Sequence, residues 1–115
     1  MKVEHDGKTY VVRWSHYSTP ESAEKYNKKL PTFVSGVKAT GMTECEVKVY
    51  CDSQPDTCVE SYTSVAYCSE NDKYVRYHAR KLTLTRAIRG LTREERTAIW
   101  DEFKRTIRTG PRRRK

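Results

Sequence analysis

Residues 43–68, TECEVKVYCDSQPDTCVESYTSVAYC, predict two β-strands joined by a turn. In residues 43–50 a cysteine and two valines alternate with charged side chains, which is the pattern of a strand with one buried face. Residues 52–56 combine Asp, Ser, Gln and Pro and have the chemistry of a turn. Residues 58–68 are rich in β-branched and aromatic side chains. We therefore expect residues 45–51 and 58–68 to pair as an antiparallel hairpin.

Residues 8–17 predict a further strand before this hairpin, because Tyr, Val, Trp and His alternate there with residues that suit a partly exposed face. Thr19 and Pro20 resemble a helix N-cap followed by proline at the first helical position. This predicts a short polar helix over residues 21–30. Proline and glycine residues punctuate the next segment, in which we expect a short strand around residues 32–37.

Downstream of the hairpin the apolar residues recur with the period of a helix. Residues 69–72 supply side chains that start helices, and we predict a helix over residues 75–89 with Gly90 as its C-terminal cap. Its apolar side consists of Leu82, Leu84, Ala87 and Ile88, with Ala79 one turn earlier.

A second helix is predicted to start at a capping box, in which Thr92 and Glu95 satisfy each other's backbone donors. The buried stripe of this helix is expected to be Ile99, Trp100, Phe103 and Ile107. Gly110 and Pro111 stop it. The predicted fold class is α+β, an antiparallel β-sheet followed by a C-terminal two-helix hairpin. We expect one domain over residues 1–110 and a flexible basic tail at 111–115.

Positive charge is concentrated in the C-terminal part of the chain. Residues 73–115 carry 15 of the 23 Lys and Arg residues but only four of the 15 Asp and Glu residues. Their net charge is +11, whereas residues 1–72 carry −3. This asymmetry indicates an anionic partner, which is either a nucleic acid or a smaller phosphate-bearing ligand.

The cysteine and hydropathy patterns argue against several classes of protein. No C-x-x-C pair is present, so we expect neither a zinc site nor a cofactor, and we interpret Cys45 and Cys68 as small buried side chains in strands. No run approaches the roughly 20 apolar residues that span a bilayer, and the first residues do not begin a signal peptide. We expect an intracellular protein without a membrane partner. A core this small also favours a homo-oligomer, in which contacts between subunits bury further surface.

The sequence contains no nucleophile motif, Gly-rich phosphate loop or metal-spaced histidine pair, so we expect a binding protein rather than an enzyme. Arginines of the helical hairpin, among them Arg86, are the best candidate ligands, because a guanidinium group makes bidentate contacts to phosphate. Four nearby rings, Tyr62, Tyr67, Tyr74 and Tyr77, could stack on a nucleobase. The alternative for each residue is structural: a solvated helix face for the arginines and half-buried packing for the tyrosines.

Residues 64–89, SVAYCSENDKYVRYHARKLTLTRAIR, contain a pattern common in small phage-encoded proteins, Ala-x-Cys-x-x-x-Asp-x-aromatic and then a basic helix ending in Leu-x-Arg-Ala-hydrophobic. The matching positions are Ala66, Cys68, Asp72, Tyr74, Lys81, Leu84, Arg86, Ala87 and Ile88. Residues 14–17 and 43–45 look like the strand part of such proteins. Over about half its length the chain thus resembles the first family of phage Thoeris anti-defence proteins.

The resemblance implies an N-terminal antiparallel sheet, two C-terminal helices and the function of a sponge. The family binds the cyclic ADP-ribose variant made by the bacterial Thoeris TIR enzyme and holds it intact, which implies a location in the host cytoplasm. Some members form hexamers and bind cyclic di- or trinucleotides at additional sites. A homo-oligomer, either a dimer or a hexamer, is therefore implied here.

Carried onto this chain, the resemblance suggests Tyr62 for stacking on adenine and both Arg89 and Arg108 for the pyrophosphate. Asp72 stands where an amide is expected to contact base or ribose, and its carboxylate accepts hydrogen bonds but repels phosphate. Lys38 is a further candidate cation. The alternative function is a small basic phage protein that binds nucleic acid through the helical hairpin and tail, with an affinity that falls steeply with salt.

Overall fold

The computed structural model describes the backbone of residues 1–69 and 75–109 and the side chains of these residues up to Thr106. Of the predicted helix-starting residues 69–72, Ser69 is instead the last residue of a strand, and residues 70–72 lie outside the described residues, as does the predicted tail at 111–115. The elements in chain order are β1 (Lys2–His5), β2 (Lys8–Tyr17), α1 (Pro20–Lys25), β3 (Ala39–Cys51), β4 (Gln54–Ser69), α2 (Arg76–Ala87) and α3 (Arg93–Thr109).

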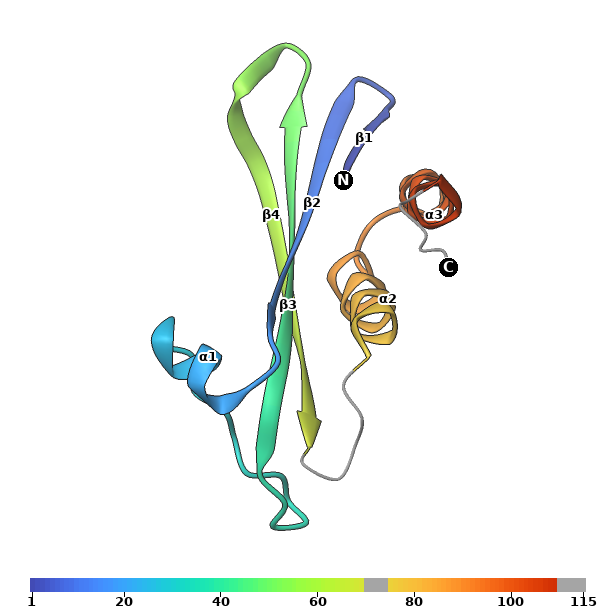
Figure 1. Ribbon diagram of the computed structural model, residues 1–115. Helices are drawn as coiled ribbons and strands as arrows, with labels where there is room; N and C mark the ends of the chain where they lie inside the picture. The colour runs from blue at the N-terminus through green and yellow to red at the C-terminus, as the bar shows by residue number, and fades with distance from the viewer. Residues whose placement is uncertain (70–74, 110–115) are drawn as a thin grey trace.

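The four strands form one antiparallel sheet in the order β1-β2-β3-β4. Helices α2 and α3 cover one face of this sheet, whereas α1 lies on the opposite side, at the end of the sheet where β3 begins (Figure 1). The predicted α+β arrangement, a sheet followed by a helical hairpin, is confirmed. The opposite face of the sheet is left open along most of its length.

The alternation in β2 and β3 assigns their side chains to the two faces as predicted. Toward the helices β2 presents Tyr10 and Val12, and β3 presents Cys45, Val47 and Val49, all of them buried. These residues join Leu84, Ala87, Ile88, Ile99 and Phe103 of the hairpin in one core. Cys45 is buried as predicted, and burial raises the pKa of its thiol to about 12, whereas Cys68 is only partly buried. No disulfide joins the four cysteines.

Strand β1 was not predicted. It is four residues long and has a single apolar side chain inside it, Val3, which is buried against the helices. The turn into β2 places Asp6 and Gly7 at φ values of 51° and 76°. Both values lie in the left-handed region that two-residue hairpin turns require, and Asp-Gly is a favoured pair for such turns. The Asp6-Gly7 pair could therefore have predicted the hairpin of β1 and β2.

The prediction for residues 21–30 was correct at the start of the helix and wrong at its end. The Thr19 side chain accepts a hydrogen bond from the Ser22 amide, and Pro20 opens α1. The helix ends at Lys25 because Asn27 adopts a φ of 58°, and the Lys28 amide then donates to the Ala23 carbonyl over 2.8 Å.

The predicted strand at residues 32–37 was also wrong. The structure has a turn there, in which the Gly36 amide donates to the Phe33 carbonyl and Gly36 adopts a φ of 89°. A single antiparallel bridge pairs Thr32 with Lys38. A left-handed glycine in the middle of the segment is compatible with a turn and not with a continuous strand.

Helix α2 is shorter than predicted and differs in two details. Its C-cap is Ile88 rather than Gly90. Gly90 does not adopt a positive φ, so this position does not require the left-handed conformation that glycine allows. Leu84, Ala87 and Ile88 are buried as predicted, but Leu82 is 44% exposed. Leu82 points away from the sheet because it lies two residues before Leu84, about 200° around the helix.

The predicted capping box of α3 is confirmed. The Thr92 amide donates to Glu95 Oε1 over 3.0 Å, and the Glu95 amide donates to Thr92 Oγ1 over 3.2 Å. The second carboxylate oxygen of Glu95 accepts a hydrogen bond from the hydroxyl group of the buried Tyr10. Burial pushes the pKa of Glu95 upward, but these hydrogen bonds outweigh it and hold the pKa below its usual value. Glu95 therefore ties the start of α3 to strand β2.

His16 lies on the helix-covered face, at the end of β2. Its Nδ1 is 2.9 Å from Thr43 Oγ1, and Arg80 Nε donates to its Nε2 over 3.4 Å. Because a guanidinium group only donates, Nε2 accepts and the ring proton lies on Nδ1. Burial, together with the positive charges of Arg80 and Arg76, lowers the pKa of His16 to about 4. The imidazole is therefore neutral in the folded protein.

This pKa predicts a loss of stability in mild acid. The unfolded chain takes up a proton on His16 near pH 6.5 and the folded chain only near pH 4, so protonation favours unfolding over this interval. We expect His16 to lower the free energy of unfolding by about 2–3 kcal/mol as the pH falls from 6.5 to 4. Urea denaturation at several pH values should show a steeper decline for the wild type than for His16→Gln. Parallel curves for the two proteins would contradict this assignment.

Candidate functional site

The helical hairpin carries the uncompensated positive charge that the sequence indicated. Residues 75–106 contain nine basic and four acidic side chains. The ion pair recorded among them joins Arg105 to Glu102. Within the part of the chain that the structure describes, the other eight cations have no carboxylate within ion-pair distance. A surface of this kind attracts anions.

A hydrogen bond fixes how α2 lies along β4. Ser64 Oγ donates to the Thr83 carbonyl over 2.5 Å, and α2 runs antiparallel to β4 (Figure 1). Tyr62 is two residues from Ser64 on the same face of the sheet, which is about 6.6 Å along the strand. The same distance corresponds to about four residues of a helix. Tyr62 is therefore level with the last turn of α2, where Arg86 and the following Arg89 lie.

Tyr62 is a half-buried ring at this end of the hairpin. It packs against the core, and its hydroxyl donates to the Glu60 carboxylate. That hydrogen bond and burial raise the pKa of Tyr62 to about 12, so the ring carries no charge at neutral pH. A neutral ring with one side supported by the core is a suitable surface for stacking a base.

Arg86 has a structural bond that its sequence position did not reveal. Its Nη1 donates to the Val65 carbonyl over 3.0 Å. Val65 lies in β4, at the edge of the sheet, and a strand edge presents backbone groups that need partners. Arg86 thus donates a hydrogen bond to the edge strand. Part of its guanidinium group is already used in this bond when no ligand is bound.

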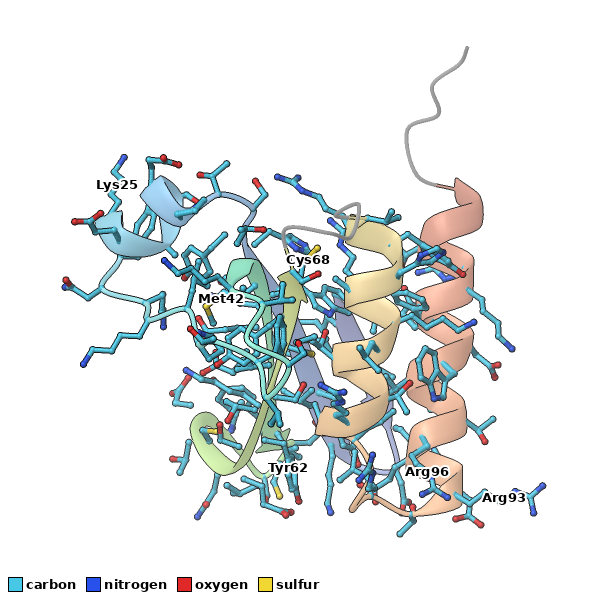
Figure 2. All side chains as sticks on the ribbon, turned by 90° about the horizontal axis from the view of Figure 1, so that it is seen from below. Lys25, Met42, Tyr62, Cys68, Arg93 and Arg96 are labelled. Carbon is cyan, nitrogen blue, oxygen red and sulfur yellow. The ribbon has the colours of Figure 1, made fainter. Side chains whose placement is uncertain are left out.

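Three arginines gather where α2 passes into α3. Arg89 is exposed just after α2, Arg93 is exposed at the first residue of α3, and Arg96 Nη1 donates to the Arg89 carbonyl over 3.3 Å. Figure 2 shows Arg93 and Arg96 at the same end of the hairpin as Tyr62. We call Arg89, Arg93 and Arg96 the arginine corner.

Sequence analysis singled out Arg89 and missed the other two members of the corner. The spacing of Arg93 and Arg96 from Arg89 could have identified them as neighbours of that residue. Arg93 and Arg96 follow Arg89 by four and seven residues. The capping box at Thr92 places the start of the second helix between Arg89 and Arg93. Only five residues connect the end of α2 at Ala87 to the start of α3 at Arg93, and so short a connection keeps the facing ends of the two helices close together.

The remaining predicted ligands do not join this corner within one chain. Arg108 lies in the last turn of α3, 12 residues beyond Arg96, which is about 18 Å along the helix. Lys38 is exposed beside the start of β3, and the paired end of β4 there is about 23 Å from Tyr62. Asp72 and Tyr74 lie outside the described residues.

Across residues 1–69 and 75–109, no three His, Cys, Asp or Glu side chains gather in a way that could hold a metal ion. Among the helices within that same part of the chain, none has the length and apolar character needed to cross a membrane.

Comparison of the chain with protein-family models, with curated proteins and with solved structures found no match to any of them. The assignment of a function therefore depends on the residues and their geometry.

Proposed function

We propose that this protein binds a small phosphorylated cyclic nucleotide through the arginine corner and Tyr62, and holds it without turnover. The observation that carries the proposal is that three arginines with no ion pair in the described chain lie at the same end of the hairpin as Tyr62, whose ring is neutral and packs against the core. Guanidinium groups match the planar oxygens of a pyrophosphate, and the ring can stack on a base. The arginines of the hairpin and Tyr62 of β4 thus supply groups for both halves of a nucleotide.

A second copy of the chain is part of this proposal. Exposed charge pairs contribute little in water, so tight binding needs a site shielded from solvent. Arg89 and Arg108 belong to opposite ends of the hairpin, and one chain leaves them far apart. A two-fold interface that pairs the hairpins in opposite directions would bring the Arg108 end of one chain to the arginine corner of the other. A homo-oligomer, as a dimer or a hexamer, would therefore complete the site.

The identity of the ligand rests on the resemblance of residues 64–89 to the first family of phage Thoeris anti-defence proteins. That resemblance favours a cyclic ADP-ribose variant as the ligand and immune evasion in the host cytoplasm as the role. The order of elements, a sheet followed by a helical hairpin, is the order that the family implies. Cyclic oligonucleotides are further ligands to test.

The proposal is tested by releasing the bound ligand. The purified protein is incubated with the cyclic ADP-ribose signal, separated from the unbound ligand by filtration, and then heated. Mass spectrometry of the filtrate should recover the intact signal in an amount comparable to that of the protein. Recovery of a cleaved product, or of no ligand, would exclude a sponge.

Nucleic-acid binding is the second candidate, favoured by the spread of positive charge along the hairpin. Besides the corner, exposed cations without a carboxylate partner in the described chain include Arg76, Lys81 and Lys104. An extended positive surface of this kind suits a polyanion. The logarithm of the binding constant for a nucleic acid should then fall linearly with the logarithm of the salt concentration. A mobility shift with short duplexes and single strands, repeated at rising salt, distinguishes the two functions.

A further inference from the structure

A hollow lies on the open face of the sheet, opposite α2 and α3. Its volume is about 310 Å³, and it is lined by residues of β1, β2 and β3, by Asp52 in the turn that follows β3, and by Pro55 at the start of β4. Helix α1 covers the other end of this face, as Figure 1 shows. Pockets that bind small molecules begin at about 300 Å³. The hollow is therefore large enough for a compact ligand.

Three cations surround the floor of the hollow. The strand register aligns Lys2 of β1 and Lys48 of β3 on either side of Val11 in β2. Arg13 follows Val11 by two residues and so points to the same face. Adjacent strands lie about 4.8 Å apart, which puts the two lysine backbones about 10 Å from each other with the valine between them. Their long side chains can converge above it.

The negative charges nearby do not neutralise this cluster. Glu46 pairs across the strands with Arg13, but its recorded ion pair is with Lys48, over 3.9 Å, at the limit of such contacts. Asp52 is the other carboxylate that lines the hollow. Within the described chain, Lys2 and Arg13 have no ion pair. The lining keeps one net positive charge, which favours an anionic ligand.

The hollow also has an aromatic wall. Tyr50 lies two residues beyond Lys48 on the same face of β3 and lines the hollow beside Pro55. A planar group could stack on the tyrosine ring while an anion is bound by Arg13 and the two lysines.

From this arrangement we propose a second binding site, for a small phosphate monoester that carries a planar ring, such as a nucleoside monophosphate. The site lies on the face of the sheet opposite the helical hairpin. It is therefore separate from the arginine corner and does not depend on the function proposed for it.

The continuation of the face argues against a polymer as the ligand. A neighbouring hollow of about 380 Å³ shares Arg13 and Glu46 with the first one, but Glu44 lines it as well. Its lysine, Lys28, is already paired with Glu44 over 2.9 Å. A chain of phosphates that left the first hollow in this direction would meet two carboxylates.

The site is tested by titrating the full chain with four probes: AMP, adenosine, inorganic phosphate and a five-nucleotide single strand. Amide chemical-shift changes locate each probe and give its affinity. We expect AMP to bind on β1, β2 and β3 and more tightly than either of its halves. Arg13→Gln with Lys48→Gln should weaken AMP by about tenfold. Tyr50→Ala should reduce the AMP affinity to that of phosphate.

Lys25→Gln with Lys29→Gln is the matched control, because it removes the same charge from exposed positions outside the hollow. We expect this control to leave AMP binding unchanged. Equal weakening by both double variants, or binding of adenosine as tight as that of AMP, would overturn the site. Tighter binding of the five-nucleotide strand than of AMP on the same strands would overturn the choice of a small ligand. The arginine corner is left intact in all these variants, so its function is assessed independently.

Discussion

Replacing Arg89 and Arg93 together by Gln should weaken binding of the cyclic ADP-ribose signal by about a hundredfold, because each guanidinium would lose a charge-assisted contact to phosphate in a shielded site. These two residues are chosen because the structure records no side-chain hydrogen bond for either within the described chain. Arg86 and Arg96 both donate to backbone carbonyls, so changing them would also disturb the fold. Isothermal titration calorimetry measures the loss.

Two comparisons make this result specific to the corner. Lys25→Gln with Lys29→Gln changes the net charge equally on the far side of the sheet, and it should leave the affinity within about twofold of the wild type because remote surface charges are screened by salt. The melting temperature of Arg89→Gln with Arg93→Gln should match that of the wild type. Unchanged affinity in this variant would place the ligand elsewhere on the molecule.

Phe103→Ala should lower the free energy of unfolding by about 3–5 kcal/mol, because it removes a large buried ring and leaves a cavity. Phe103 is 4% exposed and lies between the two helices and the sheet. Its ring centroid is 5.4 Å from that of Trp100, 5.8 Å from that of Trp14 and 6.2 Å from that of Tyr77. Loss of the ring therefore affects α2, α3 and β2 together. Urea denaturation followed by circular dichroism measures the change.

Leu82→Ala provides the contrast for this prediction. Leu82 is apolar like Phe103 but is 44% exposed on α2. Alanine is also a good helix former, so this substitution should change the unfolding free energy by less than about 1 kcal/mol. A large loss for Leu82→Ala would mean that an interface between copies covers this side of α2.

The parts of the fold that were predictable are those with a local cause. β2 followed from its alternation, and α3 followed from the Thr92–Glu95 capping box, which needs only residues three apart. The end of α1 was not predictable from apolar spacing, because it depends on the left-handed Asn27. β1 is too short to show a period, and it forms because β2 offers it a partner.

The site was predictable only in part, for a related reason. A sequence pattern shows that a residue belongs to a helix. It does not show which residues of other elements will lie beside it in the folded protein. Tyr62 and Arg89 come to the same end because the Ser64–Thr83 hydrogen bond aligns α2 with β4. Arg108 is carried to the other end by the length of α3. Lys2, Arg13 and Lys48 were missed because they come from three strands whose register the sequence does not reveal.

The bond from Arg86 to the Val65 carbonyl has a consequence for self-association. An incoming strand that lined up with β4 at this point would have to displace a charged group from the acceptor it needs. Stacking of many copies into a continuous ladder is therefore opposed by a residue of the helix next to that edge. Any contact between copies of this chain is therefore expected to avoid this part of β4.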